Sequence, residues 1–184
     1  NVGFIYKLSR EIWDRHPCCA FTVTKEFATT YPNTFLAMWR AIVDATHYAS
    51  DPAHRKEIAS AIAPTNYLNQ PVTVLEQVLT GTYADGLGNI KKEPNRIDFD
   101  PYPWHSMAIW ILTQMKRWGH LKGDVNYKSV AEQVYRAADC DRIAKELGYA
   151  THQSTTTRHV IMGKEFDSNN ADAYVKSFKI HSMA

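Results

Sequence analysis

The sequence has little net charge, few cysteines and no long apolar stretch, and each shortage excludes a class of protein. Its 184 residues include 21 Lys and Arg against 19 Asp and Glu, which leaves a formal net charge of +2. That balance gives no electrostatic basis for binding nucleic acid or an anionic membrane surface. No stretch reaches the roughly 18 consecutive apolar residues that a membrane-spanning helix needs. The sequence therefore predicts neither nucleic-acid binding nor a membrane span.

The three cysteines, Cys18, Cys19 and Cys140, do not have the pattern of a disulfide framework. Adjacent cysteines rarely pair with each other, and an odd number leaves at least one free thiol. A structural zinc site needs cysteine pairs about two to four residues apart, with a second pair elsewhere, and that spacing is missing. The glycine-rich stretch at 81–88 has neither the lysine of a phosphate-binding loop nor the spacing of a dinucleotide-binding turn. We therefore expect no metal and no cofactor.

The beginning of the sequence does not have the features of a secretion signal. It starts with Asn1, and residues 1–10 contain no basic region followed by an apolar core and a cleavage site. The hydrophobic fraction of 45% and the charged fraction of 22% are nevertheless those of an ordinary globular domain. We interpret the sequence as the continuation of a longer protein whose N-terminal half is missing.

Two short stretches near the N-terminus have the composition of β-strands. Gly3–Leu8 and Cys19–Thr24 are rich in aromatic and β-branched residues. Between them, Ser9 is placed to cap one helical turn, which Pro17 would end. No third stretch is a convincing strand, and two strands alone make only a marginal sheet. The remaining strands are therefore expected upstream of this sequence.

Most of the sequence is predicted to be helical. The strongest helix is Tyr31–Ala49, where apolar residues recur every three or four positions and predict one buried face. Four residues of that face are expected to be deeply buried: Phe35, Trp39, Ile42 and Val43. Start and stop residues predict further helices at 52–64, 71–81, 106–118, 127–138, 139–147 and 170–178. Residues 83–102 and 153–158 are expected to be irregular.

The helix at 106–118 also has an amphipathic pattern. Its predicted buried side contains five large apolar residues, Met107, Trp110, Ile111, Met115 and Trp118. Gly119 follows as its stop signal. Together the patterns predict a helix-rich chain with strands only near its beginning.

Two groups of residues are candidates for chemistry, and each also has an ordinary structural explanation. His16 with Cys18 and Cys19 could supply a thiol nucleophile and a base, although no local signature of a cysteine enzyme is present. A partly buried strand start explains the same residues, and we favour it. His105 lies at a helix start, where free backbone N–H groups suit an anion. Packing of its aromatic neighbours onto another helix is the simpler interpretation.

Four segments, in collinear order, resemble the nitrate- and bicarbonate-binding proteins of bacterial ABC importers. Glu11–Phe21 (EIWDRHPCCAF) is similar to their ELW-x-x-HPEKAFG segment, and Tyr31–Pro52 is similar to the helix that follows it. Tyr102–Gly119 (YPWHSMAIWILTQMKRWG) is similar to YPYKSHD-x-WFLTEN-x-RWG and contains the most specific motif, Trp110–Gly119. Val175–Ala184 matches the way those proteins end. The resemblance covers essentially the whole sequence.

This resemblance implies a periplasmic-binding-protein fold of the second type, in which two α/β lobes close on a small anion. The chain is expected to be the C-terminal part of that α/β fold, helix-rich with few strands. Residues 1–24 would form the end of the second lobe and the crossover strand. Residues 25–184 would form the helices and wrapping tail that complete the first lobe. Most ligand-contacting residues would then lie in the missing N-terminal half.

The function that the resemblance implies is that of the solute-binding component of an ABC importer for nitrate, bicarbonate or a related small oxyanion, without enzymatic activity. Its partners would be the small inorganic anion, the ABC permease and the missing N-terminal half. Its location would be periplasmic, with or without a membrane anchor. Three alternatives stay open. The first is a cytoplasmic nitrate or nitrite sensor acting through a protein partner, and the second is a sensor domain fused behind the importer's ATPase. The third is an enzyme like the thiamine-pyrimidine synthesis proteins, whose five-residue cysteine motif is absent here.

The ligand site is expected at the crossover, at Cys19, Cys18 and His16. The resembling proteins place a lysine fourth in their His-Pro-Glu-Lys motif, where it is suited to pair with the bound anion. Here His16 and Pro17 are followed by Cys18 and Cys19, so that cysteine replaces both Glu and Lys. A neutral thiol is a much weaker hydrogen-bond donor than an ammonium group. We therefore expect either a ligand other than nitrate or a basic residue supplied by the missing half.

Overall fold

The computed structural model describes residues 3–180, and these residues form two compact units. Unit 1 contains the residues up to Arg15 together with Val23–Asp100. Unit 2 contains His16–Thr22 together with the residues from Pro101 onward. The chain therefore passes between the units at three places. The boundary expected after residue 24 concerns the complete two-lobed fold and stays a prediction.

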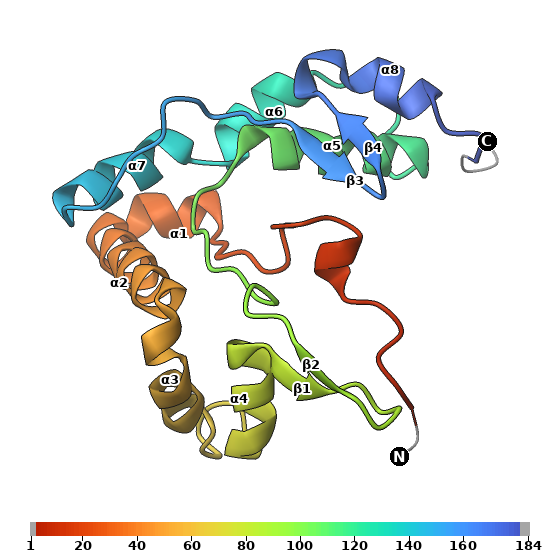
Figure 1. Ribbon diagram of the computed structural model, residues 1–184. Helices are drawn as coiled ribbons and strands as arrows, with labels where there is room; N and C mark the ends of the chain where they lie inside the picture. The colour runs from red at the N-terminus through yellow and green to blue at the C-terminus, as the bar shows by residue number, and fades with distance from the viewer. Residues whose placement is uncertain (1–2, 181–184) are drawn as a thin grey trace. The chain divides into compact units, whose positions relative to one another are not determined.

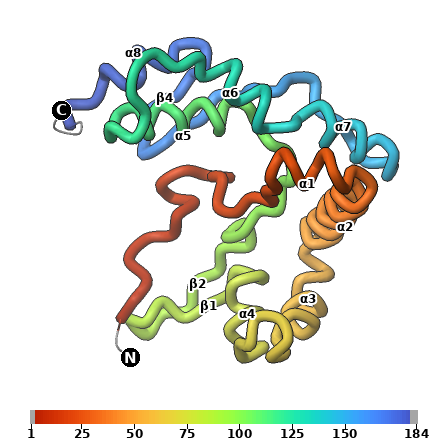
Figure 2. The backbone as a smooth tube through the Cα atoms, turned by 180° about the vertical axis from the view of Figure 1, so that it is seen from behind, coloured from red at the N-terminus to blue at the C-terminus, as the bar shows by residue number. Residues whose placement is uncertain are grey.

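Unit 1 is built mainly of helices. In chain order its elements are η1 (Ser9–Glu11), α1 (Lys25–Thr30), α2 (Pro32–Ser50), η2 (Pro52–His54), α3 (Arg55–Ile62), α4 (Val72–Thr80), β1 (Thr82–Ala84) and β2 (Ile90–Lys92). Figure 1 shows α2 leading through η2 into α3. Helices α3 and α4 lie side by side both in that view and from behind (Figure 2).

Local sequence signals place the ends of these helices. The Asp51 carboxylate accepts a hydrogen bond from the Ala53 backbone N–H at 2.8 Å and caps η2. Gly81 ends α4 with a φ of 72°, a left-handed conformation that glycine adopts without steric cost. The predicted helices at 31–49, 52–64 and 71–81 are thereby confirmed. Ser9 is the first residue of the short turn η1 and not its cap, which is Leu8, and the turn ends at Glu11, well before Pro17. The short helix α1 was not predicted.

The predicted buried face of α2 is right for two of its four residues. Trp39 and Val43 are buried, whereas Phe35 and Ile42 are only half-buried. Within unit 1 the elements that pack on α2 are the short α1 and η2. Because these elements are much shorter than the 19-residue helix, they cover only part of its apolar stripe.

A buried arginine joins three parts of the backbone of unit 1. Arg55 is 6% exposed and lies at the start of α3. Its guanidinium donates to the carbonyl of Ala49 at 3.4 Å, of Leu79 at 3.1 Å and of Pro94 at 3.0 Å. Two of these carbonyls belong to the last turns of α2 and α4, where no backbone N–H of the helix can reach them. Arg55 therefore completes the ends of two helices at once.

Unit 2 contains the C-terminal elements. They are α5 (His105–Arg117), α6 (Tyr127–Val134), α7 (Ala137–Glu146), β3 (His159–Ile161), β4 (Lys164–Phe166), η3 (Ser168–Asn170) and α8 (Ala171–Lys176). Helix α5 packs against both α6 and α8. The predicted helices at 106–118, 127–138, 139–147 and 170–178 are confirmed to within a few residues.

The buried side of α5 differs from the prediction. Its most buried residues are Ser106, Ile109 and Thr113, whereas Trp118 is 45% exposed and Met115 is 36% exposed. Small side chains at these positions allow neighbouring elements to approach the helix axis closely. The prediction was wrong because it assumed that the largest apolar residues mark the buried side.

The two predicted strands are also wrong for this chain. Gly3–Leu8 and Cys19–Thr24 form no ladder in the described part of the chain, although the Ile5 N–H donates to the Asp85 carbonyl at 2.8 Å. The strands that do form are two antiparallel hairpins, β1–β2 and β3–β4. They arise in or beside segments predicted to be irregular, because three-residue strands leave too short a pattern to detect. A strand needs a partner, and the expected upstream partners stay a prediction.

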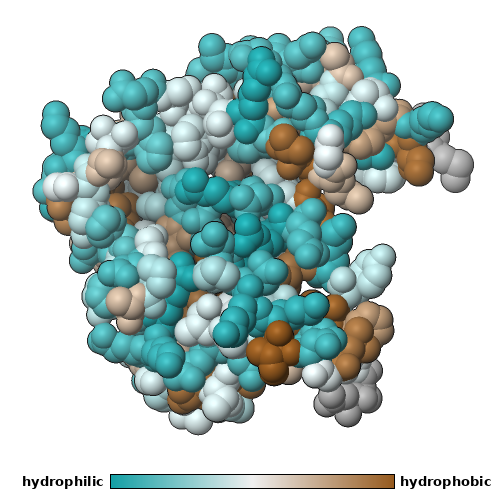
Figure 3. All heavy atoms as spheres, in the orientation of Figure 1, coloured by the Kyte–Doolittle hydropathy of each residue, from teal (hydrophilic) through white to brown (hydrophobic). Residues whose placement is uncertain are grey.

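The surface and the helix lengths give two further findings. On the face shown in Figure 3, hydrophilic side chains predominate and hydrophobic ones occur in separate small groups. Among residues 3–180, no helix combines the length and the apolar character that crossing a bilayer requires. The chain is thus helix-rich with few strands, as the sequence predicted.

Candidate functional site

The predicted site residues lie in the short segment of unit 2 that follows Arg15. Cys18 and Cys19 are both exposed and carry free thiols, with their Sγ atoms 3.9 Å apart. His16 is half-buried. The third cysteine, Cys140, is buried in α7 and donates to the Pro101 carbonyl at 3.7 Å. The structure therefore brings the two predicted thiols together at an accessible position.

The surroundings of Cys18 favour its neutral thiol. The hydrogen bond with Cys19, followed by the charge interaction with the same residue, raises the pKa of Cys18 above its usual value. A nucleophilic cysteine needs the opposite shift, because the thiolate is the reactive species. Cys18 can thus offer a weak, uncharged S–H donor to a ligand, and the direction of its pKa shift is not the one that activates a nucleophile.

Arg15 holds the chain in place immediately before this segment. Its Nε donates to an Asp98 carboxylate oxygen at 2.9 Å, and its Nη2 lies 3.4 Å from a carboxylate oxygen of Asp100. The hydrogen bond from Arg15 to Asp98 is the main reason that the pKa of the guanidinium is raised. The backbone of Arg15 has a φ of 56°, which is uncommon for a residue other than glycine.

The segment around His105 is a packed aromatic cluster. The His152 ring stacks on Tyr102 with centroids 3.7 Å apart, and Trp104 meets both rings edge-on. The backbone N–H of His105 donates to the Thr155 carbonyl at 2.8 Å, and its Nε2 lies 2.8 Å from the Tyr135 carbonyl. The first amide of α5 is therefore occupied by protein. The aromatic packing agrees with the simpler interpretation, and the His105 amide is not available to an anion.

A Ser–His pair that the sequence did not indicate lies inside unit 2. Ser106 Oγ and His159 Nε2 are 2.9 Å apart, and the Thr157 N–H donates to the same Oγ at 3.1 Å. Burial lowers the pKa of His159, so the imidazole is neutral near pH 7. The distance suits a nucleophile and its base. Ser106 is 0% exposed, however, so that no substrate reaches it and the pair joins α5 to β3 instead.

The absence of a sequence signal for this pair has a simple cause. The two residues are 53 positions apart, and neither belongs to a local motif. No spacing rule links a helix start to a distant three-residue strand. Chain folding alone brings them together.

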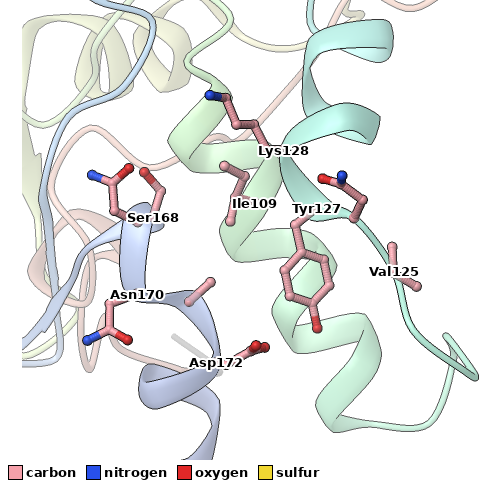
Figure 4. Close-up of a pocket in the computed structure, with 10 residues that line it drawn as sticks. Ile109, Val125, Tyr127, Lys128, Ser168, Asn170 and Asp172 are labelled. Carbon is pink, nitrogen blue, oxygen red and sulfur yellow. The ribbon is translucent and has the colours of Figure 1, made fainter.

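A polar hollow of about 300 Å³ lies between α5, the start of α6 and the η3–α8 turn. Figure 4 shows Tyr127 and Asp172 pointing toward the same space. Burial, and then the charge of Asp172, raises the pKa of the Tyr127 hydroxyl. The remaining polar lining includes Lys128, Ser168 and Asn170. The hollow is open and carries both charge signs, which gives it no selectivity for an anion.

Metal binding has no support in the part of the chain that the structure describes. Residues 3–180 contain no cluster of three or more His, Cys, Asp or Glu side chains placed to hold an ion. The exposed thiol pair is therefore two donors without further ligands. The candidate site that remains is the segment of His16, Cys18 and Cys19.

Comparison with known proteins gives consistent matches. A sequence profile of the NMT1-like family matches residues 1–63. The chain is 29% identical to the bicarbonate transport ATP-binding protein CmpC of Synechocystis sp., over 98% of this chain and 28% of that protein. It is 27% identical to the nitrate/nitrite binding protein NrtA of Synechococcus elongatus, over 100% of this chain and 43% of that protein. The chain thus spans less than half the length of these relatives.

The fold matches a solved structure of the same group. The crystal structure of the periplasmic nitrate-binding protein NrtA from Synechocystis PCC 6803 superimposes with a TM-score of 0.87 and 22% identity. The match covers 94% of this chain and 48% of that chain. The resemblance inferred from the sequence is therefore confirmed, with this chain similar to the C-terminal part of such proteins. The predicted fold class, part of a periplasmic-binding-protein fold, is confirmed as well.

Proposed function

We propose that this chain is the C-terminal part of a periplasmic solute-binding protein that delivers nitrate, bicarbonate or a related small oxyanion to an ABC permease. The observation that carries the proposal is collinear similarity to a nitrate/nitrite binding protein along 100% of the chain. The TM-score of 0.87 supports it independently, because the fold is that of a protein with the same role. A binding protein needs no reacting groups, which fits the raised pKa of the Cys18 thiol and the inaccessible Ser–His pair.

In this proposal Cys19, with Cys18 and His16, contributes to the ligand site. The exposure of both thiols supports the assignment, since a ligand can reach them. Neither thiol adds a positive charge near neutral pH, so this segment binds a small anion more weakly than a lysine would. The rest of the binding energy comes from the complementary half of the protein.

Calorimetric titration of the full-length protein with nitrate and bicarbonate tests this function. We expect saturable binding of at least one of the two anions and none of an uncharged solute such as urea. Cys19→Lys should strengthen nitrate binding, because it adds an ammonium donor where the resembling proteins have one. Thr22→Lys adds the same charge to an exposed position three residues further along and serves as the matched control. Absence of binding by the wild type would refute the function. Equal effects of the two substitutions would refute only the assignment of Cys19.

A second candidate role is supported by the match to CmpC. That relative is an ATP-binding protein, and its 29% identity with this chain is slightly higher than that of the binding protein. In this role the chain would be a solute-sensing part of a larger ATP-binding component. The native polypeptide separates the two roles by its size, because the chain covers 28% of CmpC and 43% of NrtA. An immunoblot of cell extract that shows the longer product would replace the first proposal with the second.

A further inference from the structure

We infer that the adjacent thiols of Cys18 and Cys19 form a two-sulfur capture site for a trivalent arsenic oxo compound, either arsenous acid or a monosubstituted organic arsenical. Both thiols are free and exposed, and their Sγ atoms lie 3.9 Å apart. The inference rests on the proposed function in one respect, because that function assigns this segment to the ligand site. It names a class of ligand that neutral sulfur donors suit better than they suit nitrate.

The backbone keeps the two sulfurs from bonding easily to each other. The peptide bond between the two residues is trans, which sets their Cα atoms about 3.8 Å apart. A relaxed disulfide needs a Cα separation of roughly 4.4–6.8 Å, so a direct bond between adjacent cysteines is strained. An atom that lies between the sulfurs and bonds to both relieves this strain, because the sulfurs then stay well apart. The geometry therefore favours a bridging atom over a disulfide.

The local chain brings the sulfurs together before any ligand arrives. Pro17 directly precedes the pair, and its ring fixes its own φ near about −65°. The Cys19 thiol donates a weak hydrogen bond to Cys18 Sγ, which holds both sulfurs within reach of one atom. Less conformational freedom is then lost on binding, and preorganisation of this kind raises affinity.

The chemistry of the pair favours arsenic over a metal cation. A metal needs deprotonated thiols, whereas the hydrogen bond with Cys19 raises the pKa of Cys18 and keeps its proton in place. Zinc prefers four ligands, and residues 3–180 contain no group of three or more ligating side chains placed around an ion. A trivalent arsenic centre with exchangeable oxygens needs only two sulfurs and accepts them as neutral thiols.

The capture step is a condensation that balances without an oxidant or a reductant. With phenylarsine oxide, each sulfur forms a bond to arsenic, the arsenic–oxygen double bond breaks, and the oxygen leaves with both thiol protons as one water. With arsenous acid, two hydroxyl groups are replaced by sulfur, and two waters leave. Arsenic stays trivalent throughout, and no net charge is created.

Mass spectrometry of the full-length protein incubated with phenylarsine oxide tests the site. We expect a gain of one phenylarsenic group with loss of two thiol hydrogens, on the tryptic peptide 16–25, which contains both cysteines. Cys18→Ser and Cys19→Ser each remove one sulfur and should raise the half-saturating concentration roughly 100-fold or more, because the second bond forms at a high effective concentration. Cys140→Ala removes a buried thiol outside the pair and should change nothing.

Competing thiols distinguish capture by two sulfurs from modification of one. 1,2-Ethanedithiol should strip the arsenic from the wild-type protein, whereas glutathione, which has one thiol, should not. Glutathione should suffice in either serine variant. No adduct, an adduct on other residues, or equal affinity in the wild type and the serine variants would overturn the inference.

Two further titrations identify the ligand and separate this inference from the proposed function. Binding of sodium arsenite to the same peptide would support arsenous acid as the ligand, and binding of phenylarsine oxide alone would support an organic arsenical. Nitrate or bicarbonate binding without arsenic capture would overturn this inference and leave the proposed function standing. Arsenic capture without binding of either anion would refute the anion function and support the two-sulfur site.

Discussion

Each unit contains a buried polar side chain that joins distant segments of its backbone, and these two side chains differ in their chemistry. In unit 1, the guanidinium of Arg55 donates to three backbone carbonyls. In unit 2, His159 pairs with Ser106 and is kept neutral by burial. A permanent cation suits helix C-termini, whose carbonyls carry partial negative charge. A neutral imidazole suits a hydroxyl and an aromatic neighbour, Phe166, with ring centroids 6.4 Å apart.

This difference teaches that a buried charge needs no carboxylate when enough oriented carbonyls surround it. It also makes the units respond differently to their environment. The stability of unit 1 should fall when packing or hydrogen-bond donors are removed, and it should change little in mild acid. Unit 2 should tolerate loss of its largest exposed aromatic residue, but its stability should depend on pH.

The largest expected effect is the loss of a buried tryptophan from unit 1, compared with the loss of an exposed tryptophan from unit 2. Trp39→Ala in α2 should lower the free energy of unfolding by roughly 3–5 kcal/mol, because Trp39 is only 8% exposed. Trp118→Ala in unit 2 should lower it by about 1 kcal/mol or less, since that side chain is 45% exposed. Urea denaturation followed by circular dichroism measures both. Similar losses of stability in the two variants would show that the Trp39 side chain is not buried in α2 as described.

Removal of the Arg55 donor should follow closely. Arg55→Met keeps much of the aliphatic volume but leaves carbonyls of Ala49, Leu79 and Pro94 without their donor. A buried carbonyl without a partner costs about 1–3 kcal/mol, so we expect a loss of about 3 kcal/mol in urea denaturation. Arg55→Lys should recover little, because an ammonium cannot span three acceptors arranged for a guanidinium fork. Full stability of the methionine variant would show that packing alone holds these segments.

Glycine substitutions compare the two units through the space around each backbone. Gly81 has a φ of 72°, and a Cβ atom there would lie 1.8 Å from the Glu93 carbonyl oxygen. Gly148 has a φ of 81°, but nothing lies within 4 Å of its added Cβ. Gly81→Ala should cost about 2–3 kcal/mol and Gly148→Ala about 1 kcal/mol, the cost of the left-handed conformation alone. Thermal unfolding of the two variants in parallel measures the stability that each one loses. Equal losses would contradict the close contact at Gly81 in unit 1.

The smallest expected effect is the pH dependence of unit 2. Burial lowers the folded-state pKa of His159 below its ordinary value of 6.5, so the unfolded chain binds the proton more readily. The contribution of His159 to stability is therefore fully present above pH 6.5 and is lost as the pH falls below it. His159→Gln keeps a polar side chain within reach of Ser106 and should flatten this dependence between pH 7 and 5. His120→Gln, at an exposed position, is the control and should leave the profile unchanged.

Sequence patterns anticipated the helices better than the packing between them. Helices α2 and α4 begin and end near the predicted residues, because prolines, caps and glycines act within one helical turn. The two predicted strands do not form, and the two hairpins that do form were not predicted, because strand formation depends on pairing with another segment. The candidate thiols were found because the pair Cys18–Cys19 is local. The ion pairs of Arg15 with Asp98 and Asp100 were not found, because Arg15 lies more than 80 positions from both carboxylates in the sequence.

The sequence by itself determined where this chain is helical, where its helices end and which protein family it resembles. The helices depend on residues within a few positions of one another, and the resemblance depends on motifs that follow one another in the same order. Only the tertiary structure decided that α5 buries Ser106 and Thr113 in preference to its tryptophans, and that Arg55 completes two helix ends. These outcomes depend on how closely distant backbones approach. That distance is set by the whole fold, and no local pattern records it.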